Sequence, residues 1–246
     1  MTEPLRFPPL LSGEACTGDP FDTAQQRAVL GCDAGLVCYH LGESTLAAAI
    51  VFAPEVPLAR AMAMLPLCGV GFQNALGALA PPEVAVHLDW SGGLRINGAS
   101  CGALRAAAST TDPAIVPDWL VIGLTLPLWP ANDDPGTTPD QTALYAEGCA
   151  DVEPPALIEA WARHTLNWIT RWSDEGPHPL HAEWRGLAFG IGEETTQAGQ
   201  TGQSGQSGQT STLTGTFLGI DEDFGMLLRD ASDTHLIPLT TLLETP

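Results

Sequence analysis

The chain of 246 residues contains no lysine, so its nine basic side chains are all arginine. They stand against 29 aspartate and glutamate residues, which gives a formal net charge of -20 at pH 7. The arginines are scattered along the whole chain and form no basic run. An acidic surface repels phosphate backbones and anionic lipid head groups, so this composition argues against nucleic-acid and membrane-surface partners.

Paired cysteine motifs and targeting segments are also missing. The six cysteines include no Cys-x-x-Cys pair, which predicts reduced, mostly buried thiols. The N-terminus has no signal-peptide pattern, and no stretch approaches the uninterrupted apolar length of a membrane span. Neither the acidic loop at 132–134 nor the pair His178 and His181 has the ligand spacing of a metal site. These absences predict a cytoplasmic protein without a metal.

Helix and strand signals alternate through the first 180 residues. Asp19-Pro20 predicts a capped helix to about Gly35, and an apolar helix is expected over 57–79, which Pro66 and the glycines kink or divide. A further helix beginning at Pro154 carries tryptophans at helical spacing, which indicates core packing. Strands are predicted at 36–40, 46–53, 84–90, 94–96, 103–108 and 118–128, with a short helix at 142–148.

From residue 182 the chain changes to short alternating strands. They are expected within 183–192, 212–221, 225–230 and 235–239. A Gln/Gly/Ser/Thr-rich segment, residues 195–211, has no apolar side chains to offset the entropy of ordering, so it is predicted to be a flexible loop. The sequence therefore predicts a larger unit of residues 1–180 and a small β unit of residues 181–246.

The stretch from His87 to Leu104, HLDWSGGLRINGASCGAL, carries two glycine-bearing turns between short apolar runs. Asn97-Gly98 is the stronger hairpin signal. The stretch resembles the core of the biotin/lipoate protein ligase family, in which a strand carrying Lys-Trp-Pro-Asn-Asp is followed by an Asn-Gly turn and Lys-x-x-Gly-Ile-Leu. The matching positions, once one residue is dropped after the turn, are Trp90, Leu94, Ile96, Asn97, Gly98, Gly102 and Leu104.

Two further segments resemble the same family in the same order. Gly123 matches the glycine of a buried strand, and Asp221 to Gly225 is similar to the hairpin of the family's small C-terminal barrel. The resemblance implies an α+β fold, with a mixed or antiparallel sheet backed by helices, followed by a small SH3-like β-barrel. It also implies a reaction that joins biotin or lipoate to ATP-Mg as an acyl-adenylate and passes the acyl group to a lysine of a carrier domain.

The site residues implied by this resemblance are Trp90, Asn97, Gly98 and Gly102. Arg105 lies near the equivalent strands and is a candidate anchor for a carboxylate or phosphate. The departures concern charge: Asp89 stands where the family has its first lysine, and the second lysine is replaced as well. Several donors for transition-state charge are therefore missing, which predicts weak or no biotin ligase activity.

Further departures lie elsewhere. The family's Gly/Arg-rich loop is reduced to the turn Leu41 to Ser44, and Pro127 replaces an asparagine.

Two other functions stay open on the sequence alone. One is a non-catalytic protein that binds a small carboxylic acid or a carrier domain. The other is a serine hydrolase, because residues 98–102 fit the Gly-x-Ser-x-Gly nucleophile elbow with Ser100 as nucleophile. Asp118 and a later histidine, His164, His178 or His181, follow in the chain order of a triad. The elbow requires a strand before the serine and a helix after it.

Overall fold

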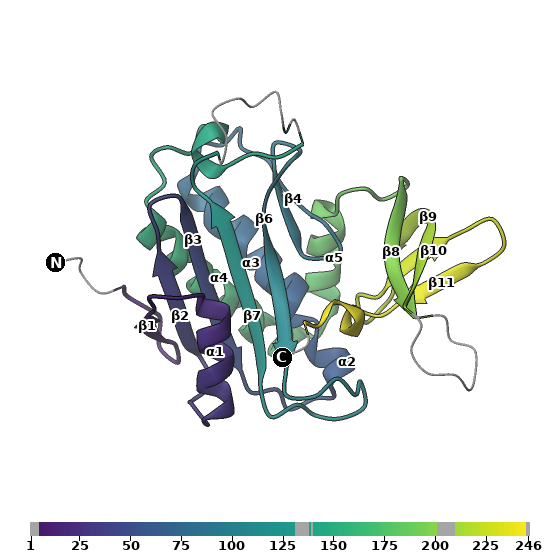
Figure 1. The fold of residues 1–246 in the computed structure, drawn as a ribbon, viewed down its shortest axis with the longest axis horizontal. Coiled ribbons are helices and arrows are strands. Elements are labelled where there is room, and N and C mark those ends of the chain that lie inside the picture. Colours follow the sequence, from purple (N-terminus) through teal and green to yellow (C-terminus); the bar gives the residue numbers. More distant parts are fainter. Residues whose placement is uncertain (1–4, 131–137, 139, 201–209, 245–246) are drawn as a thin grey trace.

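The computed structural model describes residues 5–130, 138, 140–200 and 210–244. Its strands form a seven-stranded mixed sheet with the order β1-β2-β3-β7-β6-β5-β4 and a four-stranded antiparallel sheet with the order β11-β10-β9-β8 (Figure 1). In the large sheet β1 and β2 pair in parallel, and the other neighbours are antiparallel. The predicted α+β architecture is confirmed.

The strands of the large sheet are β1 (Ser12–Ala15), β2 (Leu36–Leu41), β3 (Thr45–Phe52), β4 (Val86–Leu88), β5 (Gly93–Ile96), β6 (Ala99–Ala108) and β7 (Leu120–Pro127). Those of the small sheet are β8 (Glu194–Gln200), β9 (Thr210–Ile220), β10 (Met226–Arg229) and β11 (Thr234–Ile237). The helices are α1 (Pro20–Val29), α2 (Leu58–Ala61), α3 (Met64–Leu79), α4 (Pro154–Glu175) and α5 (His178–Leu187), with 3-10 turns η2 (Leu144–Glu147) and η3 (Leu239–Leu242).

Helix α1 begins as its sequence predicts but ends earlier. The Asp19 side chain accepts a hydrogen bond from the Phe21 amide at 2.9 Å, and Pro20 occupies the first helical position, where no amide donor is needed. The helix ends at Val29 instead of near Gly35, because Gly31 adopts a left-handed conformation with φ of 84° just after it.

The predicted apolar helix over 57–79 is two helices. The break lies at Met62 and Ala63, before Pro66, since a proline cannot donate to the carbonyl four residues earlier. By length and composition the stretch Leu58–Leu79 could cross a membrane, with a mean hydropathy of 1.3 in its most apolar window. The expectation that no stretch approaches such a length was therefore wrong. Because 67% of the window is buried inside the protein, the stretch also has the character of a core helix.

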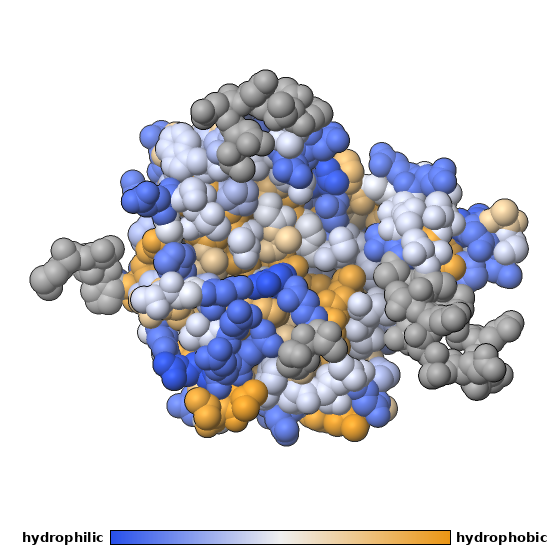
Figure 2. All heavy atoms as spheres, viewed as in Figure 1, coloured by the Kyte–Doolittle hydropathy of each residue, from blue (hydrophilic) through white to orange (hydrophobic). Residues whose placement is uncertain are grey.

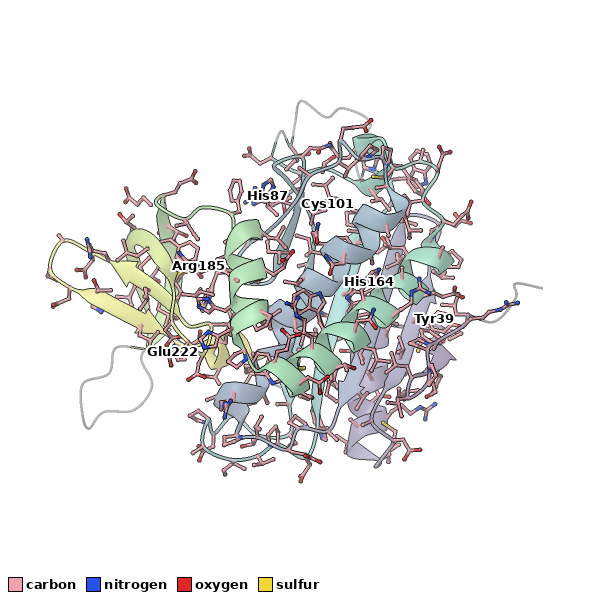
Figure 3. The ribbon with its side chains drawn as sticks, turned by 180° about the vertical axis from the view of Figure 1, so that it is seen from behind. Tyr39, His87, Cys101, His164, Arg185 and Glu222 are labelled. Carbon is pink, nitrogen blue, oxygen red and sulfur yellow. The ribbon has the colours of Figure 1, made fainter. Side chains whose placement is uncertain are left out.

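The large sheet separates two layers of packing. Helix α3 covers β6 and β7 on one face and packs against α4, which reaches β2 (Figure 3). Helix α1 lies on the other face, over β2, β3 and β7 (Figure 1). Strand β6 shows the alternation clearly, since Leu104 and Ala106 belong to the core under α3 and Ala107 to the core under α1. Arg105 therefore points to the α1 side.

Three predictions for the second half of the chain need correction. The strand predicted at 183–192 begins instead inside helix α5 (His178–Leu187), and the boundary expected at residue 180 lies inside the same helix. Both ends of the predicted loop at 195–211 belong to β8 and β9, and its middle, 201–209, lies outside the described residues. The expected short helix at 142–148 is the 3-10 turn η2. The tryptophan-bearing helix is confirmed as α4.

Candidate functional site

Part of the sheet face beside α1 carries only small side chains. Thr125 of β7 pairs with Ala47 of β3 on one side and with Ala103 of β6 on the other, and all three residues are half-buried. Figure 2 looks onto this face, with strongly hydrophilic surface over α1 and paler or orange surface over the strands beside it. We call these three residues the open sheet face, because short side chains leave its floor accessible.

Arg105 lies two residues along β6 from this floor, at the N-terminal end of α1. Its register partner Gly123 is covered by the ring of Phe21, and the Arg105 guanidinium carbon lies 4.3 Å from the centre of that ring. Only glycine fits at 123, since a Cβ there would collide with Phe21. This cation–π contact holds the Arg105 guanidinium against the Phe21 ring of α1.

Two carboxylates already occupy the Arg105 guanidinium. Its NH2 group donates to Asp19 Oδ2 at 2.6 Å, and its NH1 group lies 3.5 Å from Glu244 Oε2. The other oxygen of Asp19 caps α1, so one side chain holds both the helix and the arginine. One positive charge thus faces two negative ones, and the local field gains no surplus of positive charge.

Glu244 reaches Arg105 because the C-terminal segment returns to the large sheet. After β11 the chain passes through η3 and runs back to β6 (Figure 1). The Glu244 amide donates to the Ala106 carbonyl at 2.8 Å, and Leu243 pairs with Ala106 in a parallel bridge. The part of the β6 edge that β5 leaves unpaired is therefore filled by the C-terminal segment.

A concave region lies between the two sheets. This inter-sheet cleft has a volume of about 310 Å³ and is lined by residues that include Asp89, Arg95, Phe189, Glu193 and Glu194. Arg95 Nε donates to Asp89 Oδ1 at 2.8 Å, and the Arg95 guanidinium carbon lies 4.1 Å from the centre of the Phe189 ring. The acidic residue that replaces the family's first lysine is thus ion-paired, and the cleft carries more carboxylates than cations.

The structure does not bring the predicted site residues together. Trp90 lies on the opposite face of the large sheet from Arg105, only 5% exposed, where its indole N–H donates to the Phe224 carbonyl at 2.8 Å. It therefore ties the large sheet to the turn before β10. Trp90 therefore does not line the open sheet face.

Asn97, Gly98 and Gly102 shape the backbone. Asn97 and Gly98 have φ of 51° and 91° in the turn between β5 and β6, as a tight Asn-Gly hairpin turn requires. The Asn97 side chain accepts from the Ala85 amide and donates to Glu147. At Gly102, φ is 97° and a Cβ would collide with the Thr125 carbonyl, so glycine is needed for β6 and β7 to pair there.

The hydrolase alternative does not fit the geometry. Ser100 lies within β6, which continues to Ala108, and no helix follows it to form an elbow. Its amide donates to the Asp140 carbonyl, and its carbonyl accepts from the Thr142 amide. His164 lies on α4, among the helices behind the sheet (Figure 3). The neighbouring thiol is also inert, because burial raises the pKa of Cys101 to about 12.

Three members of the site escaped sequence reasoning. Asp19 was identified only as a helix cap, and Phe21 and Glu244 gave no local signal. A signal existed for Phe21, since a glycine in a buried strand such as Gly123 indicates that something approaches closely. Within the described residues no group of three or more histidine, cysteine, aspartate or glutamate side chains could hold a metal ion.

Two protein-family models match parts of this chain. The model of the biotin/lipoate A/B protein ligase family matches residues 7–186, and that of a domain of unknown function, DUF4444, matches residues 204–245. No curated protein matches. A crystal structure of a biotin protein ligase-like protein of unknown function from Silicibacter sp. TM1040 is 64% identical, with 98% of this chain and 100% of that chain covered and a TM-score of 0.87.

More distant structures share the fold. The biotin protein ligase from Aquifex aeolicus in complex with biotin and ATP is 15% identical, with 93% and 94% of the two chains covered and a TM-score of 0.65. That from Leishmania major in complex with biotinyl-5-AMP is 14% identical, with 94% and 98% covered and a TM-score of 0.55. With the match over residues 7–186, the chain belongs to the biotin/lipoate A/B protein ligase family.

Proposed function

We propose that this chain binds a small carboxylic acid at the open sheet face, next to Arg105, without activating it as an acyl-adenylate. The observation that carries the proposal is the state of Arg105. It is the arginine that borders this floor, and Asp19 and Glu244 already compensate its charge. One arginine with an exchangeable partner can hold a single carboxylate.

Adenylation makes a larger electrostatic demand. When a carboxylate attacks ATP, negative charge gathers on both the acid and the phosphates, so several fixed donors must face the reacting atoms. The chain has no lysine, Asp89 stands at the first lysine position, and Arg95 is engaged with it at 2.8 Å. Losing one transition-state donor costs about a hundredfold to a thousandfold in rate, and here more than one is absent.

The uncharged side chains of the open sheet face also favour one kind of ligand. The side chains of the open sheet face are short and uncharged, which suits an apolar acyl chain or ring system, while a triphosphate would meet an acidic surface. Biotin and ATP are bound by the Aquifex aeolicus ligase. For this chain we propose binding of the acid and not of ATP.

Calorimetry with biotin, lipoate and octanoate tests the proposal. We expect one of these acids to bind, and Arg105→Ala to weaken that binding about tenfold to a hundredfold, the worth of a charged hydrogen bond. Arg163→Ala is the matched control, because Arg163 is an exposed residue of α4 and leaves the open sheet face unchanged. Equal loss in both variants, or binding that Arg105→Ala does not change, would contradict the assignment.

The competing function is an active ligase in which arginines replace the lysines. It requires ATP-dependent pyrophosphate release with the same acid. A carrier domain as the bound partner is the remaining alternative, and it predicts binding of a purified biotin carrier domain that free acids do not displace.

A further inference from the structure

The C-terminal segment has a feature that packing alone does not require. After η3 the chain leaves the small sheet and extends to the edge of β6, where Leu243 and Glu244 meet Ala106. The last described residue then turns its carboxylate to Arg105. A segment from the end of the chain thereby places a carboxylate at the position where the proposed ligand would place its own.

We propose that residues 239–244 form a strap whose Glu244 carboxylate occupies the acid-binding position on Arg105, so that a ligand must displace it. This inference rests on the proposed function, and it adds a regulatory element to the same site. The strap is an internal competitor: binding of an acid and release of Glu244 are one event.

The two carboxylates on Arg105 differ in how firmly they are held. Asp19 lies 2.6 Å from NH2, and its second oxygen is fixed by the Phe21 amide at the start of α1. Glu244 lies 3.5 Å from NH1, and its side chain is 46% exposed. Exchange therefore takes place at NH1, while Asp19 stays in position and keeps the guanidinium oriented.

The contacts of the strap explain why its end can detach from the large sheet. The Glu244 amide donates to the Ala106 carbonyl, and Leu243 forms a parallel bridge with the same residue. Leu239 is buried in the main core, whereas Leu242 and Leu243 are only partly buried against it. The strap is thus anchored at η3 and loosely bound at its end, so the end can leave without unfolding the small sheet.

Removing the competing charge tests this directly. In Glu244→Gln, calorimetric affinity for octanoate should rise about twofold to fivefold, which is the fold-change expected from an exposed ion pair. Glu83→Gln removes the same charge from an exposed residue before β4 and should leave the affinity unchanged. The double variant Arg105→Gln/Glu244→Gln should bind octanoate no better than Arg105→Gln alone.

Amide hydrogen exchange gives a second readout. Octanoate should speed exchange of the Glu244 amide in the wild-type protein, and Glu244→Gln should speed it at residue 244 without any ligand. If octanoate binds while affinity and exchange are the same in wild type and Glu244→Gln, the strap is overturned and the proposed function stands. If no acid binds either protein, the proposed function fails, and unchanged exchange in Glu244→Gln would then reject the strap as well.

Discussion

Trp90 offers the sharpest test of how the two sheets are joined. Its indole is buried at 5% exposure and donates to the Phe224 carbonyl at 2.8 Å, across the boundary between the large sheet and the small one. In Trp90→Phe the ring remains apolar, but that carbonyl is left buried without its partner. The unmade hydrogen bond costs about 1–3 kcal/mol. The smaller ring loses roughly 1 kcal/mol of apolar burial.

The expected loss of unfolding free energy is therefore about 2–4 kcal/mol, a large share of the ~5–15 kcal/mol typical of a folded protein. Urea unfolding followed by circular dichroism measures it, because tryptophan fluorescence would change with the substitution itself. The matched control is Trp129→Phe, since Trp129 is 55% exposed and meets Tyr145 edge-on at 4.9 Å between ring centres. The control should change stability by less than about 0.5 kcal/mol.

The reasoning fails if Trp90→Phe and Trp129→Phe lose the same small amount. A second outcome separates structure from ligand contact. Because Trp90 and Arg105 lie on opposite faces of the sheet, Trp90→Phe should keep its affinity for a bound acid under conditions in which it is folded. A loss of affinity in Trp90→Phe with unchanged stability would show that Trp90 contributes to the ligand site.

Three further changes have defined outcomes. Asp19→Asn should keep the α1 cap and lose only the ion pair to Arg105, so its unfolding free energy in a urea titration should fall by less than about 1 kcal/mol. Asp19→Ala also loses the cap, so its unfolding free energy should fall by roughly 1 kcal/mol more. Gly102→Ala should destabilise by more than about 1 kcal/mol in thermal unfolding, because φ is 97° and the new methyl would meet the Thr125 carbonyl; an unchanged melting temperature would contradict the close approach. Backbone amides and neighbouring side chains hold the pKa of Asp230 well below its usual range, so its contribution to stability is present above about pH 4 and is lost as the pH falls; Asp230→Asn should flatten the acid limb of a stability-against-pH curve.

Local signals in the sequence were enough for most of the elements near the site. The Asn97-Gly98 dipeptide predicts the hairpin between β5 and β6, and Asp19-Pro20 predicts the start of α1, because both depend on the residues themselves and their immediate neighbours. The end of α1 was missed, whereas the division of the apolar helix was expected and only its position, at Met62 and Ala63, was not. Those boundaries depend on a single glycine conformation and on where a proline removes a hydrogen bond.

Long-range contacts were beyond local pattern reading. The ion pairs of Arg105 join residues separated by most of the chain, Asp19 and Glu244, and no periodicity indicates which acidic side chain will meet which arginine. Trp90 shows the same limit, since an aromatic residue that floors a ligand and one that packs between two sheets have the same sequence pattern. The resemblance to the ligase family predicted the fold, and the loss of positive charge at the matched positions argued against the family's reaction.

The prediction missed helix α5 for a different reason. Residues 183–192 alternate in a manner typical of a strand, but the hydrogen bonds begin at His178, where a proline follows directly and opens a helix. Tertiary packing of Leu180 and Trp184 against the core then favours the helical spacing.

ATP-dependent pyrophosphate exchange with biotin tests the central claim most directly. The assay follows label moving from pyrophosphate into ATP, and it reports acyl-adenylate formation even when no carrier domain is present. The biotin ligase of Aquifex aeolicus serves as the positive control, and lipoate and octanoate are run beside biotin. Exchange at background level with all three acids, at concentrations where calorimetry shows one of them bound, is the predicted result. Robust exchange with any of them, lost in Arg105→Ala, would contradict the account and identify the chain as an active ligase.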